Sequence, residues 1–462
     1  MKDNIPKSGF ITDRNLILGL DLYQLTMGAA YYQYNLENSI EEKDDIAVFE
    51  YFVRRFPKNR NYLIFAGLEQ LIFYLQKARF SEEIITYLRN KEIFQKIDSS
   101  FFDDYLPNFK FKIDVFSIKE GTFFFPNEPI IRVQGPIFHA QLVETFLLNV
   151  INFQIIIASK ASRIKNISQN KTLLEFGTRR AHSPLAGIYA ARASYIAGFD
   201  GTSNVIADFE LGIRSVGTMA HSYVQKFEQE IESFKTYYDI YKENTVLLID
   251  TYNIEKAAKK ISIIGKDIKA VRIDSGDLIN NSKKVRQILD KNGNNDILIV
   301  ASSDLNEYKI KEILDNNAPI DAFGIGTELV TSKDDPTLSG VYKLIEYNKI
   351  PKIKISEEKI IIPGQKQVYR TYNNGMFIKD KISLKDEIPP ENSTPLLIPI
   401  MKKGKLLYKI PKLSEVRDYC ISNIEKLPKK YKKLNKIKFK EVEISDTLRL
   451  LLNSLIKEKK NE

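Results

Sequence analysis

The middle of the chain alternates short apolar, β-branched runs with helical stretches, and this alternation constrains the fold more than any other feature. Strand-helix units of about thirty residues favour a parallel sheet, and many such units in series favour a barrel. The predicted strands are 172–176, 214–217, 245–249, 270–273, 297–301, 320–324 and 341–346. The predicted helices between them are 181–197, 220–234, 254–264, 278–292 and 305–316. The sequence therefore predicts an α/β fold with an irregular barrel, closed or incomplete.

The segments on either side of this alternation have a different pattern. Helical spacing is predicted at 18–34, 67–77, 82–89 and 139–163, with strands at 45–53 and within 111–133. Beyond residue 350 the pattern is mixed and marked by prolines. We therefore expect three parts: an N-terminal α+β domain at 1–150 that C-terminal segments partly complete, a catalytic α/β barrel at 151–350, and a mixed C-terminal region at 351–462.

Composition excludes several classes of protein. The hydrophobic fraction of 43% and the charged fraction of 28% are typical of a soluble globular protein. Apolar runs such as 155–158 are shorter than a membrane span and the N-terminus has no signal-peptide pattern, so no membrane contact is expected. One cysteine, Cys420, excludes a disulfide framework and indicates the cytoplasm. With only three histidines, the chain has no zinc cluster to build.

The net charge of +10 is concentrated at the C-terminal end. Residues 401–462 hold 18 Lys and Arg against 8 Asp and Glu, whereas the first 400 residues balance at 51 against 51. A basic tail can bind nucleic acid. Lysine is abundant throughout the chain, however, so we interpret the tail as a solvated surface and do not expect a nucleic-acid partner.

Four polar motifs lie where predicted strands give way to helices, at 175–182, 217–222, 271–277 and 323–327. Barrel enzymes keep their active sites at the carboxyl ends of the strands. The two glycines in the last motif, Phe-Gly-Ile-Gly-Thr, let successive N–H groups point at a phosphate, although a plain tight turn is the alternative. Together the motifs predict an enzyme that acts on a phosphorylated substrate.

Two of these motifs carry charged or titratable side chains. Arg272 and Asp274 alternate onto one side of a strand end, where they can bind a phosphate and a ribose or magnesium. A structural ion pair is the alternative. His221 begins a predicted helix, a position that favours a neutral imidazole able to accept a phosphoryl group. His182 is a second candidate, and His139, which opens an apolar helix, is interpreted as structural.

An aromatic ring and two guanidiniums fall within five residues in the first motif. Phe176 can stack on a flat ligand, while Arg179 and Arg180 supply positive charge. This combination suits a negatively charged aromatic molecule, although a generic strand end is the alternative.

Taken together, these motifs resemble the nicotinate phosphoribosyltransferase family. The resemblance runs through most of the chain and includes further motifs at 21–27, 49–55, 144–149, 198–204 and 363–370. It implies the type II phosphoribosyltransferase fold and a magnesium-dependent reaction of NAD salvage. In that reaction nicotinate and phosphoribosyl pyrophosphate give nicotinate mononucleotide and pyrophosphate, coupled to ATP hydrolysis.

The resemblance also implies a role for each site residue. His221 would be the phosphohistidine, and Arg272 and Asp274 would meet the phosphoribosyl pyrophosphate. Phe176 would form an aromatic sandwich with Tyr23 of the facing subunit in a homodimer. The other implied contacts are Arg179 at the carboxylate or nearby phosphates, Asp250 at the diphosphate, and Ser303, Asp304, Gly326 and Thr327 at the ribose and 5′-phosphate. It assigns no magnesium ligands.

Several alternatives to this function stay open. The nicotinamide phosphoribosyltransferase family has an aspartate where this chain has Ser203; a serine hydroxyl can donate to a carboxylate that an aspartate would repel, which favours nicotinate. Quinolinate phosphoribosyltransferases are shorter and would need a more basic pocket. An inactive relative acting as a binding protein would have lost His221, Arg272 or the glycine turn, and none is lost. A nucleic-acid scaffold would lose its affinity on removal of residues 401–462.

Overall fold

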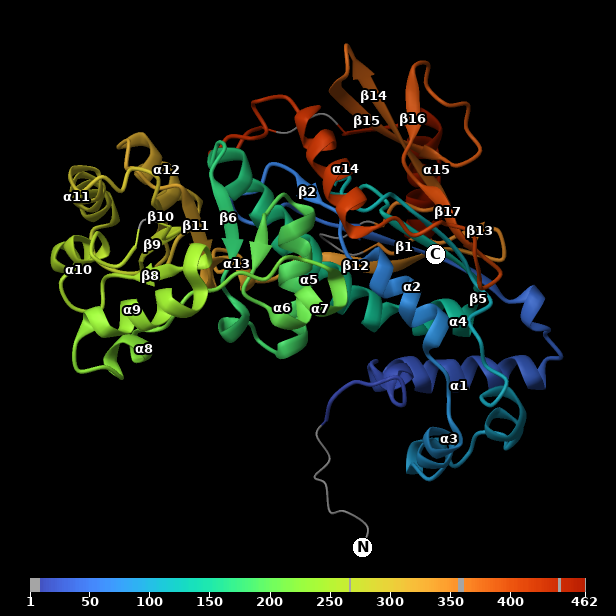
Figure 1. The fold of residues 1–462 in the computed structure, drawn as a ribbon. Coiled ribbons are helices and arrows are strands. Elements are labelled where there is room, and N and C mark those ends of the chain that lie inside the picture. Colours follow the sequence, from blue (N-terminus) through green and yellow to red (C-terminus); the bar gives the residue numbers. More distant parts are fainter. Residues whose placement is uncertain (1–8, 266, 356–360, 439–441, 462) are drawn as a thin grey trace, which may run out of the picture.

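The central feature of the computed structural model is a curled parallel sheet of six strands (Figure 1). The structure describes residues 9–265, 267–355, 361–438 and 442–461. The strand order is β7-β6-β11-β10-β9-β8, and every neighbouring pair is parallel. The strands are β6 (Thr172–Glu175), β7 (Gly201–Thr202), β8 (Val246–Leu248), β9 (Ala270–Ile273), β10 (Leu298–Ala301) and β11 (Ala322–Ile325). The predicted α/β fold is confirmed.

The barrel is incomplete because β7 and β8 remain the two edges of this sheet. The segment predicted as a strand at 214–217 lies at the open seam between them. A single bridge joins Ser215 to Thr202, and the Val216 N–H donates to the Thr202 carbonyl at 2.8 Å. On the other side, Thr218 Oγ1 donates to the Val246 carbonyl at 2.6 Å. These bonds are too few to make a strand, so the predicted strand is wrong and the seam stays open.

Helices connect the strands and begin directly after the strand-end loops. They are α6 (Pro184–Ile196), α7 (Val205–Leu211), α10 (Ile254–Ile261), α11 (Leu278–Lys291) and α12 (Glu307–Asp315). The predicted helix at 220–234 is two helices, α8 (His221–Gln225) and α9 (Glu230–Tyr241). The side chains of Asn204, Asn253, Asp277 and Asn306 each accept a backbone N–H at the start of the helix that follows. These caps satisfy backbone donors and hold the chain where it leaves each loop.

A second sheet, in which every neighbouring pair is antiparallel, combines segments from both ends of the chain. Its order is β13-β12-β1-β5-β3-β17-β18. The strands are β1 (Ile46–Val53), β3 (Asp114–Ser117), β5 (Ile131–Pro136), β12 (Gly340–Tyr347), β13 (Ile350–Pro351), β17 (Ile398–Lys402) and β18 (Lys405–Leu406). The strand predicted at 341–346 as part of the barrel is β12, which pairs antiparallel with β1 instead. Alternating apolar residues indicate a strand but do not identify its partner.

The remaining elements surround these two sheets. N-terminal helices α1 (Leu22–Glu37), α2 (Leu68–Lys77) and α3 (Glu82–Arg89) form close to their predicted positions. A third sheet, β16-β14-β15-β19, holds β14 (Lys366–Asn373), β15 (Met376–Leu384), β16 (Ser393–Pro395) and β19 (Val442–Ile444), and a small pair joins β2 (Leu63–Ile64) to β4 (Phe123–Phe124). Helices α14 (Leu413–Glu425) and α15 (Asp446–Asn461) lie in the basic C-terminal part. The division of the chain at residues 150 and 350 stays a prediction.

The long helix α5 (Glu144–Ile167) packs between the two main layers. Ile155 belongs to the core of the N-terminal layer, whereas Ile156 and Ile157 belong to the core of the barrel. Together with α4 (Ile137–Leu142) it forms a stretch long and apolar enough to cross a membrane, and its most apolar part has a mean hydropathy of 1.6. This stretch was not expected from the sequence, where only short, uninterrupted apolar runs were considered. Within the protein, 72% of the most apolar part is buried, as in the core helix of a soluble protein.

A buried ion pair joins barrel helix α6 to the N-terminal layer. Arg192 donates to both carboxylate oxygens of Glu120 at 2.8 Å and to Glu69 at 2.9 Å. Burial alone would raise the pKa of Glu120, but Arg192 and the backbone N–H groups of Gly67 and Leu68 together lower it below its ordinary value. The carboxylate therefore stays charged inside the protein.

Replacing this guanidinium should destabilise the fold. Arg192→Met leaves the Glu120 carboxylate buried without its partner, and we expect the free energy of unfolding to fall by about 3–5 kcal/mol. Adding Glu120→Gln should recover part of that loss, since the unpaired charge is removed. Urea denaturation at pH 7 measures both effects, and a double variant no more stable than Arg192→Met would contradict this account.

Candidate active site

Ten of the twelve residues expected at the substrate or catalytic site line one cavity of about 590 Å³ at the carboxyl ends of the barrel strands. They come from β9, from the loops after β6, β7, β9, β10 and β11, and from the start of α8. The ten are Phe176, Arg179, Ser203, His221, Arg272, Asp274, Ser303, Asp304, Gly326 and Thr327. Strands that run parallel bring these distant motifs to a single edge of the sheet.

Arg272 and Asp274 form an ion pair at the wall of this cavity. Arg272 Nη2 lies 2.8 Å from Asp274 Oδ1, and Arg272 Nε donates to Ser302 Oγ at 2.9 Å. Ser302 Oγ in turn donates to Asp274 Oδ1. The structural ion pair considered as the alternative therefore exists, and both of its members also border the cavity. Ser302 was not predicted as a site residue, since its only signal in the sequence is its place beside Ser303 at the end of β10.

The Phe176 ring packs against a glycine and lies near a guanidinium. A Cβ atom on Gly324 would lie 2.4 Å from Phe176 Cδ2, so the ring needs a glycine at this position. Arg272 Cζ lies 5.9 Å from the centroid of the ring, within range of a cation–π contact. The ring and the positive charge are thus fixed side by side.

His221 is the first residue of α8, and its side chain is 40% exposed. Its Nδ1 lies 3.1 Å from Thr251 Oγ1, and its Nε2 lies 3.9 Å from Asp274 Oδ2. A neutral ring that donates from Nδ1 to Thr251 leaves the lone pair of Nε2 available. Thr251 was missed because a single hydroxyl in a loop has no distinguishing pattern. His182 is exposed and is not among the residues that line the cavity.

Asp250 does not line the cavity but forms a hydrogen bond with Asp274, which does. Its Oδ2 accepts the Asp274 N–H at 2.9 Å and the Ser275 hydroxyl at 2.6 Å. Its Oδ1 is buried and has no hydrogen-bond partner in the described part of the chain. The described part of the chain contains no group of three or more His, Cys, Asp or Glu side chains suited to hold a metal ion. A divalent cation here would depend on one or two carboxylates together with oxygen atoms of a ligand.

The loop after β10 has a strained backbone. Ser303 and Asp304 have φ angles of +101° and +44°, a region that residues with a side chain rarely occupy. Two such residues in a row cost about 1–3 kcal/mol each and persist only where the surroundings hold them. On the neighbouring strand, Gly326 and Thr327 form the turn from β11 into α13 (Thr327–Val330).

Ser203 and Arg179 lie on the side of the cavity nearest β6. The Ser203 N–H donates to the Glu175 carbonyl at 2.8 Å, which places Ser203 directly after β7. Burial raises the pKa of Glu175, whose carboxylate accepts the Thr202 hydroxyl at 2.5 Å and the Gly177 N–H. Arg179 is exposed on a short turn after β6 and is therefore free to meet a ligand from solvent.

Tyr23 lies elsewhere, on α1. Its hydroxyl donates to Glu144 Oε2 at 3.0 Å, and burial together with that carboxylate raises the pKa of Tyr23 to about 12. It lines a different pocket, with Asn149 and Asn152 of α5. Within one chain, therefore, Tyr23 and Phe176 are not brought together.

Comparison with known proteins gives consistent matches along the chain. Residues 18–152 match the nicotinate phosphoribosyltransferase N-terminal domain, residues 172–380 the nicotinate phosphoribosyltransferase family, and residues 389–452 the nicotinate phosphoribosyltransferase C-terminal domain. The nicotinate phosphoribosyltransferase pncB2 of Mycobacterium tuberculosis is 40% identical over 421 residues, covering 90% of this chain and 88% of its own. The nicotinate phosphoribosyltransferase of Bacillus subtilis is 38% identical, covering 94% of both chains.

Solved structures agree with these matches. The human nicotinic acid phosphoribosyltransferase superposes with a TM-score of 0.83 at 25% identity, over 94% of this chain and 99% of its own. The nicotinate-nucleotide pyrophosphorylase of Pyrococcus furiosus has the same fold, with a TM-score of 0.73 at 24% identity over 91% and 99% of the two chains. From its sequence, its fold and the length over which both agree, the chain belongs to the nicotinate phosphoribosyltransferase family.

Proposed function

We propose that this protein transfers the phosphoribosyl group of phosphoribosyl pyrophosphate to nicotinate, giving nicotinate mononucleotide and pyrophosphate in NAD salvage. The observation that carries the proposal is one cavity that brings together an aromatic ring, an Arg–Asp pair and the two loops that contain Ser303–Asp304 and Gly326–Thr327. Relatives named for this activity match the chain over most of its length. The one cysteine, Cys420, is buried and unpaired, which supports a cytoplasmic location.

Nicotinate fits the side of the cavity formed by Phe176, Arg179 and Ser203. The pyridine ring would stack on Phe176, and its carboxylate would pair with the Arg179 guanidinium. The Ser203 hydroxyl can donate a further hydrogen bond to a carboxylate, whereas the aspartate of the nicotinamide-specific family would repel it. This arrangement favours the acid over the amide.

Phosphoribosyl pyrophosphate would occupy the rest of the cavity, next to the nicotinate. Its ribose and 5′-phosphate would contact the two loops that contain Ser303, Asp304, Gly326 and Thr327. The pyridine nitrogen forms a bond to the anomeric carbon while the bond from that carbon to the pyrophosphate oxygen breaks. Arg272, held in place by Asp274 and Ser302, would stabilise the charge that develops on the departing pyrophosphate.

The residues beside Arg272 fit a magnesium ion. Asp250 offers a buried oxygen without a hydrogen-bond partner in the described chain. Asp274, whose backbone N–H donates to the other oxygen of Asp250, has a side chain that is 26% exposed. These two carboxylates would hold the ion together with oxygen atoms of the substrate. When bound, magnesium supplies positive charge that favours departure of pyrophosphate.

His221 is placed to couple the reaction to ATP. Its Nε2 would form a bond to the γ-phosphorus of ATP as ADP leaves, and water would later break that P–N bond to release inorganic phosphate. Support comes from the contact of Nδ1 with Thr251 and from the 40% exposure of the side chain. A phosphoryl group on His221 would add negative charge next to Asp274 and so alter binding of pyrophosphate.

We also propose a homodimer in which Tyr23 of each chain reaches the cavity of its partner. Tyr23 is 44% exposed, and Leu22 beside it is 47% exposed. On α7, directly after Ser203, Val205 and Phe209 are 73% and 86% exposed. Large apolar side chains grouped near a site mark a surface that another protein covers. A second copy that brings α1 to α7 would cover both sets.

Product formation tests the reaction directly. The purified protein should convert phosphoribosyl pyrophosphate to mononucleotide with nicotinate, more strongly with ATP and magnesium, and not with nicotinamide. Chromatographic assay of both mononucleotides decides the outcome. Ser203→Asp is the matched specificity variant and should weaken nicotinate more than nicotinamide. Product from nicotinamide in the wild type would reverse the specificity, and no product from either substrate would favour a binding protein.

Replacing the histidine should separate synthesis from ATP hydrolysis. His221→Ala removes the phosphoryl acceptor, so ATP should no longer stimulate the reaction, while slow ATP-independent synthesis continues. Acid-labile ³²P transferred from γ-labelled ATP to the wild type but not to the variant provides an independent measurement. His182→Ala is the control. Loss of labelling in that control, with labelling retained in His221→Ala, would move the acceptor to His182.

Mixing two inactive variants tests the homodimer. Chains that carry Tyr23→Ala, refolded with chains that carry Arg272→Ala, form mixed dimers in which one of the two sites is intact. With random pairing, about a quarter of wild-type activity should return. The control pairs Phe176→Ala with Arg272→Ala, which lie in the same cavity and leave no intact site. Equal recovery in both mixtures, or recovery in neither, would exclude a shared site.

A further inference from the structure

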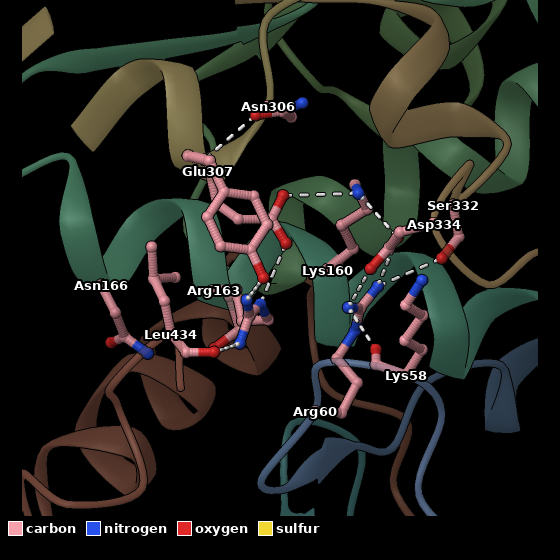
Figure 2. Close-up of polar contacts among 12 residues, drawn as sticks. Lys58, Arg60, Lys160, Arg163, Asn166, Asn306, Glu307, Ser332, Asp334 and Leu434 are labelled. Carbon is pink, nitrogen blue, oxygen red and sulfur yellow. Dashed lines mark hydrogen bonds and ion pairs between the residues drawn. The ribbon is translucent and has the colours of Figure 1, made fainter. Parts of the chain in front are cut away.

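Six charged side chains form a cluster next to the two loops that contain Ser303–Asp304 and Gly326–Thr327. We call this set the anchor cluster; it consists of Arg60, Lys160, Arg163, Glu307, Glu328 and Asp334. None of the six is among the residues that line the cavity. Figure 2 shows five of them, with Lys160 and Arg163 projecting from the same helix, α5. None of the six takes part in the proposed reaction.

Lys160 touches all three carboxylates of the anchor cluster. Its Nζ lies 2.7 Å from Asp334, 3.3 Å from Glu307 and 3.9 Å from Glu328 (Figure 2 shows the first two contacts). The side chain is only 1% exposed. A buried ammonium is tolerated only where opposite charges surround it. Lys160 therefore requires carboxylates from three separate segments of the chain to lie close together.

The two arginines pair with two of these carboxylates. Arg163 Nε donates to Glu307 at 3.0 Å, and Arg60 donates to Asp334 at 2.7 Å. Burial would raise the pKa of Glu307, but Lys160 and Arg163 hold it below its ordinary value; the pKa of Asp334 is lowered likewise, chiefly by Arg60. Glu328 also pairs with the exposed Lys333 at 3.0 Å, so removing Lys160 leaves each of the three carboxylates with a single cation.

The carboxylates are close in sequence to the loops of the cavity. Glu307 is the first residue of α12 and follows the strained Asp304 by three positions. Glu328 directly follows Thr327. Because one ammonium contacts both glutamates, it links the ends of two loops that come from neighbouring strands, β10 and β11. The separation of those loops is then set from outside the cavity.

We propose that Lys160 is a positioning residue that holds the Ser303–Asp304 loop and the Gly326–Thr327 loop at the spacing needed to bind one phosphorylated ligand between them. The inference rests on the proposed function in taking that ligand to be phosphoribosyl pyrophosphate. A misplacement of about 1 Å in such a site lowers its efficiency on the order of a hundredfold. Lys160 acts here through backbone position and touches no substrate.

Hydrogen exchange tests the positioning without any assay of activity. Lys160→Met keeps the length of the side chain and removes the charge, so backbone exchange should rise in peptides that cover 302–306 and 326–335. The control is Lys366→Met. Lys366 is also buried and lies 2.8 Å from a carboxylate, that of Glu50, but it belongs to β14. The proposal would be overturned if exchange in the two loops rose equally in Lys160→Met and Lys366→Met. It would also be overturned if exchange in these loops did not rise in Lys160→Met.

Steady-state kinetics give the second measurement. Lys160→Met should raise the KM for phosphoribosyl pyrophosphate about tenfold to a hundredfold while changing the KM for nicotinate far less. Lys160→Arg should restore most of the difference, and Lys366→Met should leave both KM values unchanged. Equal changes in both KM values for Lys160→Met would mean that the residue only stabilises the fold.

A milder variant covers the case in which Lys160→Met does not fold. Glu328→Gln removes one charge from a side chain that is 12% exposed, and it should shift loop exchange and the KM for phosphoribosyl pyrophosphate in the same direction by a smaller factor. Unchanged values in a folded Glu328→Gln protein would also overturn the proposal. If the wild type makes no mononucleotide at all, the proposed function fails, and the exchange experiment alone decides whether Lys160 holds the loops.

Discussion

A charge inside a protein requires an opposite charge beside it, and much of this structure is arranged around that requirement. Helices α5 and α6 carry Lys160, Arg163 and Arg192 into the interior, where carboxylates from distant segments meet them. Apolar packing between the layers is tolerant of small shifts, whereas these pairs are specific in distance and direction. They therefore define how the barrel, the N-terminal layer and the C-terminal segment at Leu434, which accepts a bond from Arg163, meet.

The arrangement of the cavity depends on this framework. The strands of an open parallel sheet bring their carboxyl ends to one edge, which is enough to gather motifs from across more than a hundred residues. The sheet alone does not set side-chain distances. Those depend on local contacts, such as the close approach of Phe176 to Gly324 and the bond from Arg272 to Ser302.

The sequence predicted the barrel and most of the cavity because both follow from periodicity: β-branched runs mark strands, and polar residues after them mark one edge. Periodicity does not identify the partner of a strand, so the strand at 341–346 was predicted in the wrong sheet. For the same reason 214–217 was predicted as a strand, although a single bridge joins it to the sheet. Ser302 and Thr251 were missed because isolated hydroxyls form no pattern. Lys160 was hidden in an apolar helix, and its partners are separated from it by well over a hundred positions.

The open seam gives the two halves of the cavity different stiffness. Arg272 sits on β9 between two hydrogen-bonded neighbours, so displacing it requires breaking the sheet. His221 instead follows the segment at 215–218, which one bridge and a few hydrogen bonds attach to the sheet. Detaching so few bonds costs on the order of a few kcal/mol, far less than global unfolding. The backbone that leads to His221 therefore has fewer hydrogen bonds to break than the strand that carries Arg272, and the Arg272 guanidinium links the two parts through its bond to the Met219 carbonyl at 3.4 Å.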